Sequence, residues 1–410
     1  MTTTINNEHK KLNVPNLRFK EFQGEWEKTT IGEIATIKNG PFGSVLHAED
    51  YVDEGMPIVT TEHFKSGNLP LSKNGIPQVS EDDYCRLKGY MLETDDIVFS
   101  RVGSVDINAH VEHVQQGWLF SGRVLRVRPI KSVNSLCLHY VLSTESVKRD
   151  IRNRAVGQTM PSINTPILSN TGIYMSQSEA EQKKIANLLS LIDERISTQN
   201  KIIEDLKKLK YAIIDYAINS IDADFIKFGS LYETAGEGGT PTTSNAAFYN
   251  DGKIPFIKID DLKQKYLTEN KDFITELGLQ KSSAWLVPTR SILFSNGATI
   301  GEISITTYPV CTKQGILGIV PKQNIDVEFL YYFMSSTYFK KAVSRIVTEG
   351  TMKTAYLKDI NNILCPIPTK EKQQEIAKMP SALNSKIDFE QSVLKLYGSQ
   401  KQYLLRQMFV

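Results

Sequence analysis

The stretch from Glu181 to Asn219 constrains the fold most, because it keeps a seven-residue hydrophobic repeat for five heptads without a glycine or proline. Eight of its ten seam positions are apolar. This pattern is typical of a coiled coil, and at about 1.5 Å per residue it predicts a helix roughly 55–60 Å long. The seam positions are Ile185, Leu189, Ile192, Ile196, Gln199, Ile203, Leu206, Lys210, Ile213 and Ala217.

Residues 371–410 repeat this pattern. The polar interruptions Glu390 and Lys401 fall where the first helix has Gln199 and Lys210. Two unrelated amphipathic helices would not be expected to share interruptions, and LHYVLSTESVKRD (138–150) likewise aligns with LYYFMSSTYFKKA (330–342), so the sequence predicts an internal duplication. The second seam reads Ile376, Pro380, Leu383, Ile387, Glu390, Leu394, Tyr397, Lys401, Leu404 and Met408.

The order along the chain is globular domain, helix, globular domain, helix. Strand-like runs alternate with Gly and Pro turns in each globular part, and helices are expected near 135–152 and 326–345. We predict an α+β protein in which two mixed α/β domains are separated by two long antiparallel coiled-coil helices, with a pseudo-two-fold internal repeat. The predicted segments are an N-terminal arm (1–25, disordered to residue 12), a first domain (26–178), a central helix (179–221), a second domain (222–370) and a C-terminal helix (371–410).

The polar seam residues suggest a register for the helix pair. Lys210 would face Glu390 and Gln199 would face Lys401, two compatible pairs. The packed part of the second helix would then begin at Pro380, where proline is tolerated as a first helical residue. The first turns of the central helix would need another partner, and the N-terminal arm is the candidate. Trp26, just after that arm, is expected to pack in the core.

Composition excludes several classes of protein. The chain of 410 residues is 40% hydrophobic and 23% charged, as in ordinary soluble proteins, and its formal charge of +2 argues neither for nor against nucleic acid. The start shows no signal-peptide core and no apolar run is long enough to span a membrane, so we expect a cytoplasmic protein without a membrane partner. The four cysteines, Cys85, Cys137, Cys311 and Cys365, are far apart and predict reduced core residues rather than disulfides.

Catalytic motifs are missing. The sequence has no GxxxxGK[ST] loop, HExxH, GxSxG elbow or GxGxxG after a strand, and no Asn/Asp-Pro-Pro-aromatic tetrapeptide of amino-methyltransferases. We therefore predict no catalytic residue, no metal site and no cofactor.

Three weaker patterns have a structural and a functional interpretation. His110 and His113 are spaced HxxH but lack further ligands, which favours a structural or surface role. The Gly236–Thr240 loop could cradle a phosphate, although a flexible turn or recognition loop is favoured because it lacks a lysine. The neighbouring acids Asp95-Asp96 and Asp260-Asp261 could hold a metal, but solvated turns are favoured.

Basic residues recur at corresponding places in the two repeats. On a strand, Arg123, Arg126 and Arg128 would lie largely on one polar side, and more basic residues follow on the next helix and its exit. A phosphate-contacting face in both repeats is consistent with DNA binding, with an ordinary solvated face as the alternative. The remaining candidates are Lys148, Arg149, Arg152 and Arg154 in the first repeat, and Lys340, Lys341, Arg345 and Lys353 in the second.

Taken together, the chain resembles the specificity subunit of type I restriction-modification systems. The resemblance covers nearly the whole chain and rests on NLRFKEFQGEWEKTTIGEI (16–34), QSEAEQKKIANLLSLIDERI (177–196), KEKQQEIA (370–377), the duplicated layout and LLRQMFV (404–410). It implies two target-recognition domains that each read one half of a split, asymmetric double-stranded DNA site. It further implies that the helices fix the spacer and dock two adenine methyltransferase subunits, that restriction subunits can join, and that this subunit is not itself an enzyme.

Such recognition domains differ too much to carry reading residues over from the family, so the candidates come from chemistry. Arg and Lys pair with guanine edges in the major groove, and Asn and Gln pair with adenine. The predicted loop residues are Arg101, Gln158 and Thr159 in the first domain, and Lys258, Asn296, Lys313, Gln314 and Lys353 in the second. Two rivals stay open. One is a protein-only coiled-coil scaffold with two adaptor domains, and the other is an enzyme with an unrecognised site.

Overall fold

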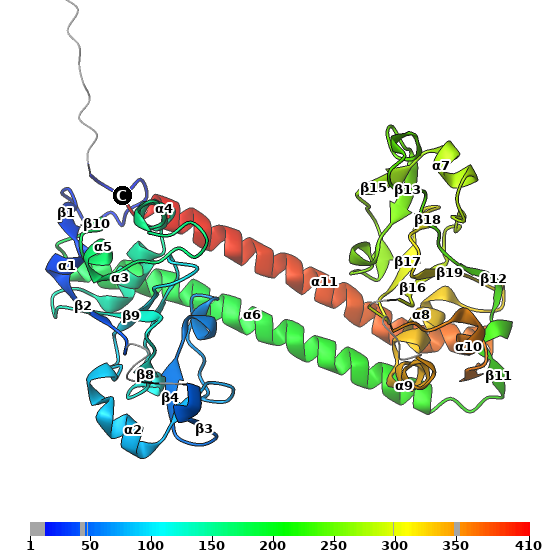
Figure 1. Ribbon diagram of the computed structural model, residues 1–410, viewed down its shortest axis with the longest axis horizontal. Helices are drawn as coiled ribbons and strands as arrows, with labels where there is room; N and C mark the ends of the chain where they lie inside the picture. Colours follow the sequence, from blue (N-terminus) through cyan, green and yellow to red (C-terminus); the bar gives the residue numbers. More distant parts are fainter. Residues whose placement is uncertain (1–12, 42–45, 47, 298, 348–352) are drawn as a thin grey trace, which may run out of the picture. The chain divides into compact units, whose positions relative to one another are not determined.

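The computed structural model describes residues 13–41, 46, 48–297, 299–347 and 353–410, and the chain divides into two units (Figure 1). The first unit comprises residues up to Thr198 together with Leu394–Val410, and the second comprises Gln199–Val393. Each unit therefore contains one α/β domain and a segment of both long helices, α6 (Glu179–Asn219) and α11 (Lys370–Gln407). The disordered arm predicted over residues 1–12 lies outside the described residues.

The first domain is built on two four-stranded sheets and one two-stranded pair. Its central sheet, in the order β2-β9-β6-β7, is antiparallel. The other sheet, β3-β5-β4-β8, is mixed because β4 runs parallel to β8, and β1 pairs with β10. The strands are β1 (Glu27–Thr30), β2 (Ala35–Asn39), β3 (Tyr51–Val52), β4 (Met56–Val59), β5 (Gln78–Val79), β6 (Ile97–Ser100), β7 (Asn108–His110), β8 (Leu119–Phe120), β9 (Val124–Pro129) and β10 (Gly172–Met175). The helices are α1 (Ile31–Ile34), α2 (Glu81–Arg86), α3 (Ser135–Leu142), α4 (Glu145–Arg154) and α5 (Thr165–Ser169).

The second domain repeats this plan with small changes. Its central sheet, β12-β19-β16-β17-β14, gains the edge strand β14, which runs parallel to β17. In the smaller sheet, β15-β13-β18, strand β13 runs parallel to β18 as β4 does to β8, and β11 pairs with β20. The strands are β11 (Phe225–Lys227), β12 (Tyr232–Glu237), β13 (Ile254–Ile257), β14 (Tyr266–Leu267), β15 (Asp272–Ile274), β16 (Ile292–Ser295), β17 (Ile303–Thr306), β18 (Cys311–Thr312), β19 (Ile316–Pro321) and β20 (Leu364–Pro366). The helices are α7 (Glu276–Gln280), α8 (Val327–Ser335), α9 (Thr337–Ile346) and α10 (Leu357–Ile360).

The duplication extends to single hydrogen bonds where each long helix begins. The side-chain oxygen of Gln182 accepts from the backbone N–H of Asn134 at 2.7 Å, just before α3. The side-chain oxygen of Gln373 accepts in the same way from Asp326 at 2.8 Å, just before α8. The predicted internal repeat and the α+β fold class are therefore confirmed.

Each domain helix predicted as one piece is two helices. The first pair, α3 and α4, is separated at Ser143 and Thr144, and the second pair, α8 and α9, is separated at Ser336. Ser336 accepts a hydrogen bond from the backbone N–H of Phe339 at 3.3 Å, so it caps a new helix instead of continuing the old one. Periodicity alone did not reveal this break because the apolar spacing continues through it.

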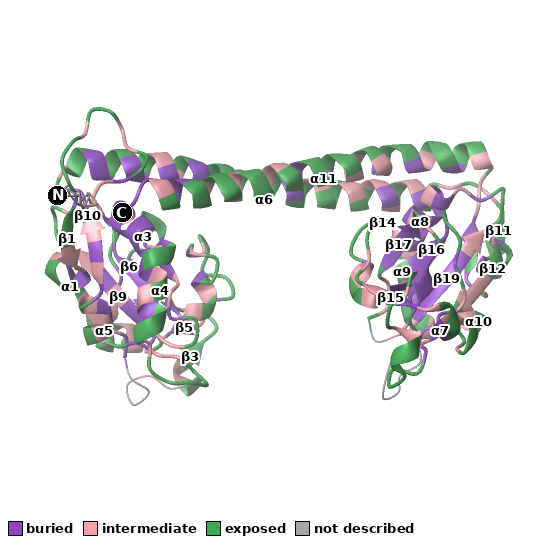
Figure 2. Ribbon diagram, turned by 90° about the horizontal axis from the view of Figure 1, so that it is seen from above, coloured by how far each residue is buried: buried purple, intermediate pink, exposed green. Residues whose placement is uncertain are grey.

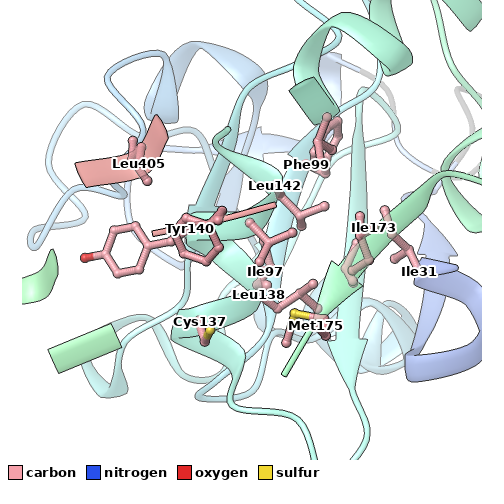
Figure 3. Packing of buried hydrophobic residues seen from close by; sticks show 14 of the residues in the cluster. Ile31, Ile97, Phe99, Cys137, Leu138, Tyr140, Leu142, Ile173, Met175 and Leu405 are labelled. Atoms are coloured by element: carbon pink, nitrogen blue, oxygen red, sulfur yellow. The ribbon is translucent and has the colours of Figure 1, made fainter. Parts of the chain in front are cut away.

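The core of each unit lies between its central sheet and its helices, where Figure 2 shows buried residues gathered. In the first unit, the side chains of α3 and β6 pack together with residues from the end of α11, and Figure 3 shows Leu405 and Tyr140 among the side chains of this cluster. Trp26 packs edge-on against Phe409 with ring centroids 5.9 Å apart. The prediction that Trp26 packs in the core is confirmed. The core of the first unit is therefore built from residues near both residue 26 and residue 409.

Within the first unit, α6 and α11 are linked by a polar cluster. Lys401 of α11 forms an ion pair with Asp193 of α6 at 2.6 Å. The hydroxyl of Tyr140 on α3 donates to the same carboxylate at 2.8 Å, so the domain and both helices share one charge. Asp193 and Lys401 are each about four-fifths removed from solvent.

Within the second unit, the repeat-equivalent lysine makes an equivalent contact. Lys210 of α6 donates to the side-chain oxygen of Asn384 on α11 at 3.1 Å. Gln199 donates to Glu390, its own counterpart in the repeat, and Lys386 neutralises that carboxylate from one turn away on α11. The predicted register, with Lys210 facing Glu390 and Gln199 facing Lys401, is therefore wrong. The charged seam residues did not specify the register, because the positive partner of Glu390 lies on the same helix.

The predicted seam residues are all buried or half-buried. Towards the end of α6 the fully buried positions shift to Ile214 and Ile218, which enter the second core. Leu405 near the end of α11 and Phe409 just after that helix enter the first. Pro380 is a buried residue inside α11, so the prediction that the packed helix begins there is also wrong. Among the described residues, no helix is both long enough and apolar enough to cross a membrane.

The first turn of α6 is covered by the N-terminal segment, as expected. The guanidinium of Arg18 binds both carboxylate oxygens of Glu181 at 2.6 and 2.9 Å, and Lys184 pairs with Glu21. Of the four cysteines, which are free thiols, three are buried as predicted. Cys85 is exposed, because it lies on the short surface helix α2.

Candidate nucleic-acid interface

Several strands of the first domain end at one edge, where backbone hydrogen bonds join the loops that follow them. Arg101, the residue after β6, donates its N–H to the carbonyl of Arg123 at 3.0 Å and accepts from Ile163 at 2.9 Å. Ser121, the residue after β8, donates to Val59 at the end of β4 at 2.9 Å. The ends of β4, β6 and β8 and the start of β9 thus meet in a fixed arrangement.

A cleft of about 830 Å³ opens at this edge. Its walls include the side chains of Arg101, Arg123, Glu62 and Tyr51 and the residue Met160. The loop that carries Met160 is closed by paired backbone bonds between Val156 and Ser162 at 2.9 and 2.8 Å. Its exposed residues include the other two predicted base-reading candidates, Gln158 and Thr159. Four predicted residues, Arg101, Arg123, Gln158 and Thr159, are thereby brought to one edge.

The other arginines of β9 do not lie at this edge. Arg128 binds both oxygens of the buried Asp96 at 2.7 and 2.8 Å and Glu93 at 2.6 Å. Arg126 is half-buried, and its burial, together with the positive charge of Arg128, lowers its pKa. The prediction that Arg123, Arg126 and Arg128 form one polar face is wrong, because Arg123 precedes the strand. Arg128 binds acids in the loop before β6, and Arg126 donates to the carbonyl of Met91 in the same loop at 3.5 Å.

Two arginines of α4, Arg152 and Arg154, are exposed but locally neutralised, whereas the predicted candidate Arg149 is exposed on the same helix. Arg152 pairs with Asp106 and Glu145. Arg154 pairs with Asp150 at 3.0 Å and donates to the carbonyl of Asn170 at 2.8 Å. A phosphate contact by either residue would have to compete with these partners.

The second domain assembles the same edge with the same backbone bonds. Asn296, the residue after β16, donates its N–H to Gly315 at 3.0 Å and accepts from Ala355 at 2.9 Å, while Lys313 donates to Ile257 at 2.9 Å. Comparison with the first domain makes Asn296 the counterpart of Arg101, and Gly315 the counterpart of Arg123. The predicted residues exposed at this edge are Lys258, Lys313, Gln314 and Lys353.

Asn296 itself is only 1% exposed, and its side-chain NH₂ donates to the carbonyl of Ala355 at 3.2 Å. The prediction that it reads a base is therefore wrong for this structure, since the side chain fastens the 353–356 segment to the sheet. Lys258 is exposed but pairs with Asp272 at 2.8 Å. Lys340 and Lys341 lie on α9, and the amine of Lys340 sits 5.3 Å from the ring centre of Tyr211 on α6.

Two glycines pack tightly at this edge, Gly40, which no sequence motif indicates, and Gly238 of the Gly236–Thr240 loop. Gly40, after β2, donates to Val124, and Gly238, after β12, donates to Ile316, the corresponding residue of β19. A Cβ on Gly40 would lie 1.9 Å from the carbonyl oxygen of Ser121, and one on Gly238 would lie 2.2 Å from that of Thr312. A real Cβ cannot fit there, so the edge requires glycine at both places. The Gly236–Thr240 stretch is thus closely packed at Gly238 and Gly239, which argues against a flexible turn, while its role as a recognition loop stays a prediction.

The histidine pair and the neighbouring acids singled out from the sequence have structural roles or lie at the surface. His110 contacts Asp95 at 3.2 Å and Ser135 at 2.9 Å, and burial lowers its pKa, which fits the structural reading. Asp96 is a buried ion-pair partner rather than part of a solvated turn, whereas the side chain of Asp260 is 94% exposed. Within the described part of the chain, no group of three His, Cys, Asp or Glu side chains could hold a metal ion.

Comparison with known proteins places this architecture in a class. The family model described as the type I restriction modification DNA specificity domain matches the chain twice, over residues 23–208 and 221–396. The chain therefore belongs to the family of type I restriction-modification specificity subunits, with two target-recognition domains.

Individual relatives agree with this assignment. The chain is 26% identical over 417 aligned residues to the putative type I restriction enzyme MjaX specificity subunit of Methanocaldococcus jannaschii, covering 93% of this chain and 92% of the relative. Its fold is similar to that of the type I restriction-modification S subunit from M. genitalium, with a TM-score of 0.58, 18% identity and coverage of 97% of this chain and 99% of that one. A chain from a structure concerned with complex assembly and conformational transition of the type I system also gives a TM-score of 0.58, at 14% identity, with 94% and 97% covered.

Proposed function

We propose that this chain is the non-catalytic DNA sequence-specificity subunit of a type I restriction-modification complex. Each target-recognition domain reads one half of a bipartite, asymmetric double-stranded DNA site. The paired helices set the spacer between the halves and dock two adenine methyltransferase subunits, to which restriction subunits can be added. The chain supplies sequence recognition, and its partners supply the chemistry.

The observation that carries this proposal is the duplicated strand-end edge. Both domains hold the edge with the same backbone bonds, yet expose different side chains at it: Arg123, Gln158 and Thr159 in one, and Lys258, Lys313 and Gln314 in the other. Two different half-sites would require the same backbone arrangement with different polar side chains, because the backbone positions the side chains and the side chains determine which bases are bound.

A second observation supports partner docking by the helices. Nine large apolar side chains on α6 and α11 are exposed. Tyr216 is 77% exposed and Leu396 is 68% exposed. Partner subunits that cover such side chains would bury apolar area that the chain leaves in water. The residues are Leu191, Ile202, Leu209, Tyr211, Tyr216, Met379, Phe389, Leu396 and Tyr403.

The test is a methylation map of DNA from cells that express this chain with its cognate methyltransferase, compared with the methyltransferase alone. We expect a split motif with modified adenines that appears only when this chain is present. The map would give both half-sites and the spacer.

Absence of any chain-dependent motif, with both proteins shown to be expressed and associated, would overturn the proposal in favour of the protein-only scaffold. Turnover of DNA by the purified chain alone would instead favour an enzyme.

A further inference from the structure

The cleft of the first domain carries an acid where a DNA-contacting surface would be expected to avoid one. Glu62 lines the cleft together with Arg101 and Arg123, its side chain is 65% exposed, and one of its oxygens pairs with Lys65 of the next turn, which leaves the other oxygen to accept a hydrogen bond. A carboxylate facing phosphate groups would repel them, so an acid at this place disfavours a backbone-contacting role for the cleft. A carboxylate does have one good partner in the major groove, the N4 amino group of cytosine, which donates a hydrogen bond.

Arg123 is the arginine whose charge this edge leaves available. Its backbone is fixed by the bond that its carbonyl accepts from Arg101, and the side chain of Arg101 donates to the neighbouring Gly122 carbonyl at 2.9 Å. The side chain of Arg123 is exposed, and within the described residues it makes no hydrogen bond or ion pair, unlike Arg128, Arg152 and Arg154. A guanidinium fork on a rigid backbone matches the O6 and N7 acceptors of guanine.

We infer that the first domain reads a guanine–cytosine base pair from the major groove, with Arg123 donating to guanine O6 and N7 and Glu62 accepting from cytosine N4. This inference rests on the proposed function and adds the identity of one base pair. It changes the role of Arg123 from the phosphate contact expected from sequence to a base contact.

The second domain lacks this pair of side chains. Its own acid, Asp260, stands where Glu62 stands, one turn before Lys263 as Glu62 is before Lys65. The place of Arg123, however, is taken by Gly315, as the matching bonds from Arg101 and Asn296 show. The inferred base pair therefore belongs to one half-site only.

The experiment maps the methylated motif for the complex of the cognate methyltransferase with the wild-type chain, Arg123→Ala, Arg123→Lys and Glu62→Ala. We expect a guanine–cytosine pair in one half-site, at which Arg123→Ala lowers discrimination by about 5- to 150-fold while the other half-site stays unchanged. Arg123→Lys should keep part of the guanine preference, because lysine also donates to guanine. Glu62→Ala should weaken discrimination at the same pair.

Lys73→Ala is the matched control, since it removes one positive charge from an exposed position of the same domain that does not line the cleft. It should leave every motif position unchanged.

If Arg123→Ala lowers methylation of all sequences equally, Arg123 contacts phosphate and the inference is overturned. Relaxation at an adenine–thymine pair, or wild-type discrimination in Arg123→Ala, would overturn it as well. A wild-type complex without any motif would instead refute the proposed function. If Arg123→Ala fails to assemble with the methyltransferase, Arg123→Lys is used instead. A general loss of DNA binding by Arg123→Lys with unaltered guanine discrimination at every position would again show that Arg123 contacts phosphate.

Discussion

The central sheets of the two units place different chemistry at corresponding positions. In the first, Asp96 just before β6 is 1% exposed and holds Arg128 of β9 in a two-oxygen ion pair. In the second, Ser291 just before β16 takes the place of Asp96, and Val320 of β19 takes the place of Arg128. The hydroxyl of Ser291 is buried without a hydrogen-bond partner among the described residues. The first sheet is thus fastened at this place by an ion pair, and the second by hydrogen bonds between the Thr306 hydroxyl and the Ser291 backbone at 2.9 and 3.4 Å.

What the two units share is backbone geometry. The bonds at the strand ends and the crowded glycines Gly40 and Gly238 are the same in both. The comparison indicates that this fold requires the same close backbone contacts in both units. The side-chain interactions that stabilise the two sheets can differ. Four predictions test this comparison.

The largest effect is expected at the buried ion pair. Asp96→Ala leaves Arg128 without its main partner and should lower the free energy of unfolding of the first unit by about 3 kcal/mol, the low end for a buried pair because 29% of the Arg128 side chain reaches solvent. Ser291→Ala removes an unpartnered hydroxyl and should change the second unit by less than about 0.5 kcal/mol. Hydrogen exchange of peptides from each unit measures both. Equal losses in the two units would contradict the comparison.

The glycines should respond alike. Gly40→Ala and Gly238→Ala each place a Cβ against a backbone carbonyl, and each should cost about 2–3 kcal/mol of stability in its own unit. Thermal unfolding and hydrogen exchange are suitable measurements. Gly398→Ala, where nothing lies within 4 Å of the new atom, is the control and should be neutral or stabilising. A substitution that is tolerated at only one of the two positions would show that the backbones are not packed equally closely in the two units.

Acid should weaken the first unit before the second. His139 is buried; burial lowers its pKa to about 3, and the nearby charges of His110, Lys401 and Lys148 lower it too. In the unfolded chain its pKa is about 6.5, so below that value only the unfolded state binds the proton, and stability falls by about 1.4 kcal/mol per pH unit, or about 2 kcal/mol at pH 5. The six histidines of the chain all lie before residue 140, so the second unit lacks this effect.

Hydrogen exchange at pH 7 and pH 5, corrected for intrinsic rates, measures this difference. His139→Gln should flatten the pH dependence of the first unit, because glutamine takes up no proton. Parallel weakening of both units between pH 7 and pH 5 would sink the assignment to histidine.

The smallest effect concerns the helix contacts. Asp193→Asn removes the partly buried ion pair with Lys401 but can still accept from Tyr140, so we expect a loss of about 1 kcal/mol in the first unit. Asn384→Asp gives the second unit the reverse change. It should be near neutral, because the gain with Lys210 is offset by repulsion from Asp388, which now accepts from the Asn384 amide. The two single variants and their combination, measured by denaturant unfolding, would show whether these clusters are independent.

Sequence alone predicted the fold class and the duplication because both rest on long periodic patterns and on interruptions that recur at one spacing. It did not predict the helix register, since Glu390 is neutralised by Lys386 from its own helix and leaves the facing helix unspecified. It also could not tell which polar side chains are buried. Asp96 and Arg128 are 32 residues apart, and Asn296 is withdrawn from the edge by Ala355, a contact that no local pattern reveals.

The participation of the end of α11 in the first core has a consequence for synthesis. The segment that completes the first unit begins at Leu394, roughly 200 residues after Thr198, and at about 5–20 residues per second it emerges some 10–40 s later. The second unit, by contrast, is one continuous segment and can close as soon as Val393 is available. During that delay the apolar surfaces around Trp26 that Phe409 covers in the finished protein are open. The domain that the ribosome makes first is therefore the one that finishes folding last.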